Sequence, residues 1–157
     1  MYNYVIAIKD YNTDKPIALK VGETRNEFSK RFQSICQVDA KKYFDREVYI
    51  EPLHLVQGSY GKETARLIED TFRLYFLRKF GIDKAFKRDY FLVHSLPEEY
   101  DKEAEAEDVR NLVLPFTGSG ATLVYSAKSN ETVDIYCKSI SMRLAKTCDW
   151  WRPKKGN

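Results

Sequence analysis

The sequence predicts an α/β (α+β) fold, in which a small antiparallel β-sheet of three or more strands is flanked by helices. Three observations lead to this prediction. The first half of the chain contains short β-rich segments separated by turn residues, and a long amphipathic segment follows them. In addition, 43% of the 157 residues are hydrophobic. That composition supports a sizeable core and excludes a chain that is disordered throughout.

The first two strands are expected at residues 2–9 and 17–21. In the first of them, one set of alternate positions carries Tyr2, Tyr4, Ile6 and Ile8. The residues between the two strands form a polar turn cluster, and such a short connection favours antiparallel pairing. The glycine that follows the second strand ends it.

A helix is expected next, starting from a cap at Thr24 or Asn26 and running to about residue 37. The third strand is expected at residues 48–56. It contains Pro52, which predicts an edge position or a bulge. The strongest helix pattern in the chain covers residues 62–80, where apolar residues recur every three or four positions.

The second half of the chain is predicted as an accessory segment, residues 95–157, packed on a core formed by residues 1–94. Residues 89–94 resemble a short strand, residues 97–112 an acidic solvated helix, and residues 122–127 another strand. Residues 133–146 fit either a helix or a strand. The two tryptophans and the basic residues at the end of the chain fit helix-end packing or contact with nucleic acid.

Composition limits the class of protein further. The net charge of +3 is too small to establish a nucleic-acid partner, and no apolar run reaches the length of a membrane span. The spacing of Cys36, Cys137 and Cys148 fits no zinc site, so reduced thiols are expected. Since the sequence also has no recognisable signal peptide, we expect a cytoplasmic protein without a membrane partner. The oligomeric state is left open.

Four residues form the candidate site. Tyr4 lies on the first strand, Lys20 precedes Gly22 at the end of the second, and Arg31 lies on the helix that follows. Glu69 interrupts the apolar stripe of the long helix, where an inward carboxylate needs a metal ion or a basic partner. Taken singly, each residue also fits a structural role: packing for the tyrosine, solvated charges for the lysine and arginine, and pairing within the helix for the glutamate.

The order and spacing of these residues resemble the GIY-YIG nuclease family over about residues 2–93. Tyr2-Asn3-Tyr4-Val5-Ile6 takes the place of the first motif, and Lys20-Val21-Gly22 takes the place of the second, as in family branches with lysine before the Ile-Gly. Arg31 matches the arginine of the next helix, and Glu69 matches the glutamate of the later long helix. Tyr2-Asn3 replaces the Gly-Ile of the first motif, and the downstream asparagine has no clear counterpart.

The resemblance implies a metal-dependent DNA endonuclease, of phage or bacterial type. In this reading Tyr4 is the general base, Lys20 favours its phenolate, and Arg31 stabilises the phosphate. Glu69 binds Mg²⁺ or Mn²⁺, while Arg25 and Lys30 contact flanking phosphates. Two alternatives stay open: a catalytically inactive nuclease-like module that binds nucleic acid, and a protein-interaction protein that uses the acidic face of residues 98–108.

Overall fold

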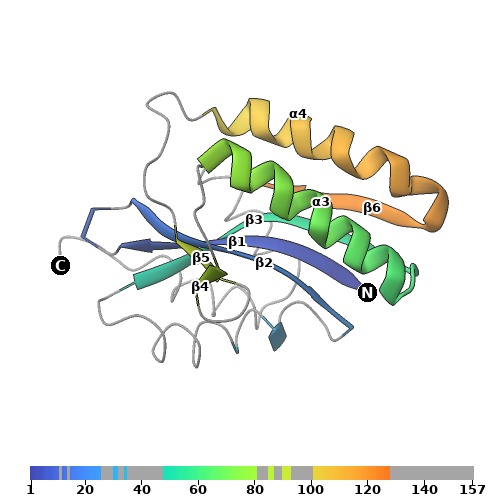
Figure 1. The fold of residues 1–157 in the computed structure, drawn as a ribbon, viewed down its shortest axis with the longest axis horizontal. Coiled ribbons are helices and arrows are strands. Elements are labelled where there is room, and N and C mark those ends of the chain that lie inside the picture. The colour runs from blue at the N-terminus through green and yellow to red at the C-terminus, as the bar shows by residue number, and fades with distance from the viewer. Residues whose placement is uncertain are drawn as a thin grey trace.

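The computed structural model describes residues 1–10, 12–13, 15–25, 30–31, 34, 48–80, 85–86, 90–92 and 101–127. These residues contain one six-stranded sheet in the order β4-β5-β2-β1-β3-β6, with antiparallel neighbours throughout. Helices α3 and α4 lie together over one face of the sheet (Figure 1). The predicted α+β fold, a small antiparallel sheet flanked by helices, is therefore confirmed.

Strand β1 (Tyr2–Asp10) is the centre of the sheet. It pairs with β2 (Pro16–Thr24) on one side and with β3 (Val48–Gly58) on the other. Its residues from Asn3 to Ile8 are all buried, so both faces of this strand are covered. Pro52 predicts an edge position or a bulge. The edge position is wrong, because β3 lies between β1 and β6. A bulge is confirmed, because the register between β1 and β3 shifts next to this residue, from the pair Val5–His54 to the pair Ile6–Pro52.

The remaining strands are β4 (Ala85–Phe86), β5 (Tyr90–Leu92) and β6 (Ala121–Ser126). Strand β5 pairs with β2, and β6 pairs with β3. Residues from the predicted accessory segment thus complete the same sheet as the N-terminal strands. They also share its hydrophobic core, to which Val109, Val113 and Tyr125 belong.

Helix α3 (Lys62–Phe80) has the bounds that the apolar periodicity predicts. The side chains that it buries recur at three- and four-residue steps: Ala65, Ile68, Phe72, Phe76 and Phe80. The side-chain amide of Asn3 on β1 donates a 2.9 Å hydrogen bond to the carbonyl of Ala65. Because side chains alternate along a strand, α3 covers the face of Asn3, and Tyr4 points to the other face.

Helix α4 (Lys102–Val113) is followed by a short 3₁₀ helix, η2 (Leu114–Ser119). The prediction that this acidic helix starts at Pro97 is wrong: the helix is capped by Asp101, whose carboxylate accepts from the N–H groups of Glu103 and Ala104. The prediction of a wholly solvated acidic face is also wrong, since Glu105 is only 1% exposed.

Two further observations complete the description. In the described part of the chain, no helix combines the length and the apolarity needed to cross a membrane. The predictions for the three cysteines, for most of the helix expected up to residue 37, for residues 133–146 and for the basic-aromatic C-terminal end lie outside the described residues.

The Asp101 cap leads to a stability prediction. Asp101→Ala removes the acceptor for two N–H groups at the start of α4 and is expected to lower the free energy of unfolding by about 1 kcal/mol. Asp101→Asn keeps a capping oxygen and should lose less than half of that. Urea unfolding of the three proteins measures the difference, and equal losses in both variants would contradict the capping role.

Candidate functional site

The phenol of Tyr4 lies directly over Gly22 on the face of the sheet opposite α3. The two residues are cross-strand partners in the β1–β2 pair. A Cβ atom built at Gly22 would stand 2.5 Å from the Tyr4 phenolic oxygen, so only glycine leaves room for this ring. A glycine is therefore required at position 22, because the Tyr4 ring occupies the space that a side chain would need.

Arg31 is bonded to the same phenol. Its Nε–H donates a 3.1 Å hydrogen bond to the Tyr4 oxygen from a point 27 residues further along the chain. The tyrosine is 1% exposed, whereas the arginine is half-buried. A guanidinium that donates to a phenolic oxygen stabilises negative charge there. The structure therefore brings two of the four predicted site residues together.

Lys20 shares this face of the sheet with Tyr4. It is the cross-strand partner of Ile6, two residues along β2 from Gly22, so its side chain leaves the sheet on the Tyr4 side. Lys20 is 1% exposed, which is unusual for lysine and indicates that a buried negative or polar group accompanies it. Arg25 and Lys30, the predicted contacts for flanking phosphates, are exposed.

Glu69 lies apart from these residues. It belongs to α3, which packs on the opposite face of the sheet, and its Oε1 accepts a 2.7 Å hydrogen bond from Nη2 of Arg73 one turn later. Its side chain is 15% exposed. The basic partner that an inward carboxylate needs is thus an arginine of the same helix. The structure does not bring Glu69 together with Tyr4, Lys20 and Arg31.

The close approach at Gly22 leads to a second stability prediction. Gly22→Ala forces the buried Tyr4 ring to move, and we expect a loss of about 1–3 kcal/mol in the free energy of unfolding. Gly61→Ala is the matched control, because a Cβ at Gly61 meets no atom within 4 Å and should change stability by less than about 0.5 kcal/mol. Chemical unfolding gives both values. A Gly22→Ala protein as stable as the control would contradict the placement of the Tyr4 ring.

A second polar cluster lies on the helix-covered face, and sequence reasoning missed it. His54 on β3 is bonded through Nδ1 to the hydroxyl of Ser126 at 2.8 Å and through Nε2 to Glu105 at 2.9 Å. The histidine and the glutamate are each 1% exposed. No spacing in the sequence links these residues, which are 51 and 72 positions apart, so only the β3–β6 pairing and the packing of α4 bring them together.

The cluster continues onto helix α3. The ammonium group of Lys79 lies 3.6 Å from Oε1 of Glu105 and donates to the hydroxyl of Tyr75 at 3.1 Å. That hydroxyl donates to Asp108 at 2.9 Å. Burial raises the pKa of Tyr75 above its ordinary value, and the nearby carboxylates raise it further, so Tyr75 stays a neutral donor.

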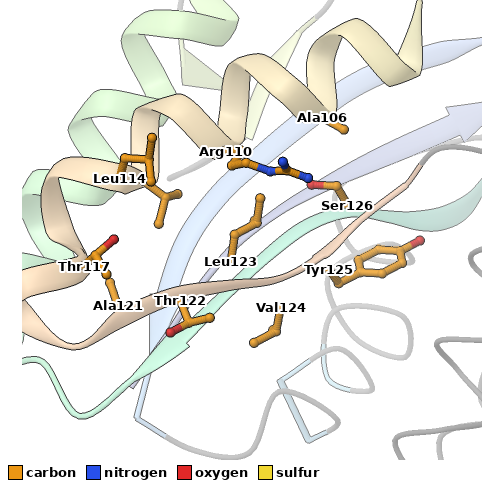
Figure 2. A pocket seen from close by; sticks show the side chains of 11 residues that line it. Ala106, Arg110, Leu114, Thr117, Ala121, Thr122, Leu123, Val124, Tyr125 and Ser126 are labelled. Atoms are coloured by element: carbon orange, nitrogen blue, oxygen red, sulfur yellow. The ribbon is translucent and has the colours of Figure 1, made fainter.

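A pocket of about 320 Å³ adjoins this cluster. It lies between α4 and β6, and Figure 2 shows Arg110 extending along it toward Ser126. Its walls are otherwise formed by apolar side chains and threonines: Ala106, Val113, Leu114, Thr117, Ala121, Thr122, Leu123, Val124 and Tyr125. Pockets of this size suit small organic ligands.

Comparisons with family models, with curated proteins and with solved structures found no match for this chain. The geometry of the two sites therefore carries the functional argument.

Proposed function

We propose that the chain is a DNA endonuclease that hydrolyses phosphodiester bonds, and that Tyr4, Lys20 and Arg31 form its catalytic site. The observation that supports this proposal best is the hydrogen bond from Arg31 Nε to the Tyr4 phenol, on a face that also holds Lys20. This hydrogen bond places the Tyr4 phenol, which can take up a proton, next to the Arg31 guanidinium, which can bind a phosphate. The GIY-YIG resemblance assigns these roles to the same positions.

The chemistry follows from these side chains. A water molecule attacks the phosphorus and gives its proton to the Tyr4 phenolate, which the neighbouring cations favour. The bond from the phosphorus to one bridging oxygen breaks, and that oxygen leaves as a hydroxyl group with a proton taken from the solvent. The guanidinium of Arg31 lies at the Tyr4 phenol, and its planar set of N–H donors suits the non-bridging oxygens of a phosphate. The exposed Arg25 and Lys30 attract the flanking backbone of the DNA strand.

The magnesium or manganese ion that the resemblance implies does not fit this group of residues. Its expected ligand, Glu69, is bonded to Arg73 and belongs to a helix on the other face of the sheet from the Tyr4 phenol. No step of the proposed reaction is therefore assigned to a metal.

Conversion of supercoiled plasmid to nicked or linear DNA tests the proposal. The protein is incubated with plasmid in Mg²⁺, in Mn²⁺ or in EDTA, together with a Glu69→Gln variant. Cleavage that survives in Glu69→Gln supports the site drawn from Tyr4, Lys20 and Arg31. If cleavage is lost both in EDTA and in the Glu69→Gln variant, Glu69 is a metal ligand of the nuclease and the site drawn without it is wrong.

The same assay separates the rival function. A protein that cleaves no supercoiled, linear or single-stranded DNA, yet binds labelled DNA with an affinity that falls steeply with salt, is a nucleic-acid-binding module. Salt-insensitive binding to a protein, with none to DNA, would instead point to the exposed acidic residues of α4, which include Glu103, Glu107 and Asp108.

A further inference from the structure

We propose that Ser126 is an activated nucleophile of a second site that hydrolyses small anionic esters. This inference is independent of the proposed nuclease function, because the Ser126 site lies on the helix-covered face at the β6 edge of the described sheet. The Tyr4 phenol points to the opposite face. Three observations carry the inference: a hydrogen-bonded chain of three side chains, the fixed position of its histidine, and the adjoining pocket.

The first observation is the chain Ser126–His54–Glu105. The serine hydroxyl lies 2.8 Å from Nδ1 of His54, and Nε2 of the same ring lies 2.9 Å from Glu105 Oε2. Both distances suit a nucleophile, its general base and the carboxylate that orients the base. The carboxylate selects the tautomer with its proton on Nε2, which leaves Nδ1 free to accept the serine proton.

The second observation is that the imidazole is held from several sides. His54 and Ser126 are cross-strand partners in the β3–β6 pair, so the backbone sets their separation. The ring packs against Phe76 of α3, with centroids 5.7 Å apart. The ammonium group of Lys79 lies 3.6 Å from the second oxygen of Glu105, so contacts on both of its oxygens hold this carboxyl group in place.

The third observation is access. Ser126 is half-buried and lines the 320 Å³ pocket, whereas His54 and Glu105 are buried and do not line it. Arg110 is the one charged side chain among the described residues of the pocket wall, and it extends toward Ser126 in Figure 2. Its side chain is 60% exposed, and its ion pair with the equally exposed Glu107 is 3.7 Å long. Because exposed ion pairs of this kind are weak, Arg110 can leave Glu107 for a ligand at little cost.

These features define the substrate class. The apolar wall of Val113, Leu114 and Leu123 suits a short acyl chain, and Arg110 suits a carboxylate or phosphate on the same molecule. The Ser126 oxygen attacks the ester carbonyl while its proton passes to His54. The bond to the alcohol then breaks, and the alcohol leaves with that proton. Water enters by the same path, releases the acid and restores the serine.

Labelling with an alkyl fluorophosphonate tests the proposal without knowledge of the natural ester. Intact mass spectrometry should show one adduct per chain, and peptide mapping should place it on Ser126. Ser119, an exposed serine of η2, is the internal control within the same molecule. An unmodified protein, or a label distributed over exposed serines, would overturn the inference.

Variants then test the role of the histidine. His54→Gln is expected to slow labelling at least about 100-fold, because general-base catalysis typically contributes that much. Glu105→Gln, which keeps the shape of the side chain, serves as the second variant should His54→Gln fail to fold. Ser119→Ala should label as the parent does. If the rate is unchanged in a folded His54→Gln or Glu105→Gln protein, Ser126 is not activated by this chain.

Discussion

Glu51→Ala is expected to lower the free energy of unfolding by about 2–4 kcal/mol. Glu51 is 1% exposed on β3, where it forms ion pairs with Lys9 of β1 and, at 2.7 Å, with Lys102 of α4. Removing the carboxylate leaves two ammonium groups that are only 15% and 21% exposed beside each other. Their partial contact with water places the expected value below that of a fully buried pair.

The same residue gives the protein an acid-sensitive contribution to stability. Burial raises the pKa of Glu51, but the charges of Lys9 and Lys102 outweigh burial and hold it below the ordinary value of 4.5. A carboxylate whose pKa is lower in the folded state than in the unfolded state stabilises the folded state. This contribution is complete when the pH is above the unfolded-state pKa, and it is lost as the pH falls through the folded-state pKa. The stability difference between wild type and Glu51→Gln should therefore be constant near neutral pH and shrink below about pH 4.5.

Urea unfolding at several pH values measures both effects. Glu107→Ala is the matched control, since that glutamate is 60% exposed and pairs with Arg110 at 3.7 Å. Exposed pairs of this kind contribute less than about 1 kcal/mol. If Glu51→Ala and Glu107→Ala have the same stability, the pairing of Glu51 with the two lysines is not a significant interaction.

Tyr4→Phe is expected to lower the rate of DNA cleavage by about 10²–10⁴-fold, the usual contribution of a general base. The variant keeps the ring that fills the space over Gly22 and loses only the oxygen bonded to Arg31. The fold should therefore persist, with a stability loss of about 0.5–1.5 kcal/mol for one hydrogen bond. Initial rates of plasmid nicking, corrected for the folded fraction, give the effect.

Tyr60→Phe is the matched control for that measurement. Tyr60 is also a buried tyrosine, and its hydroxyl donates a 2.8 Å hydrogen bond to Asn3, on the helix-covered face of the sheet. Its removal has a similar structural cost but touches none of the proposed catalytic groups. If Tyr4→Phe and Tyr60→Phe nick plasmid at the same rate, the Tyr4 oxygen has a structural role only and is not the general base.

Much of the fold follows from local patterns in the sequence. The apolar periodicity of residues 62–80 predicts α3 with its observed bounds, because one face of this helix meets the sheet along its whole length. The alternation in residues 2–9 predicts β1, and the proline at position 52 predicts the bulge of β3. Each of these signals arises from residues that are close together in the chain.

The parts that the sequence does not predict depend on contacts between distant residues. Glu105 belongs to an acidic run whose composition is typical of a solvated helix, yet its partners His54 and Lys79 come from β3 and α3. The candidate site shows the same limit. Local spacing suggests that Tyr4, Arg31 and Glu69 belong together, but the alternation of β1 places α3 and the Tyr4 phenol on opposite faces of the sheet.

A double-mutant cycle on plasmid nicking tests the central claim, that Tyr4 and Arg31 act as one catalytic unit. The initial rates of wild type, Tyr4→Phe, Arg31→Ala and the double variant are compared at equal folded concentration. Residues that act as a unit have strongly non-additive effects, so the double variant should be within about threefold of the slower single variant. Two losses that multiply, or single variants as fast as wild type, would contradict the claim.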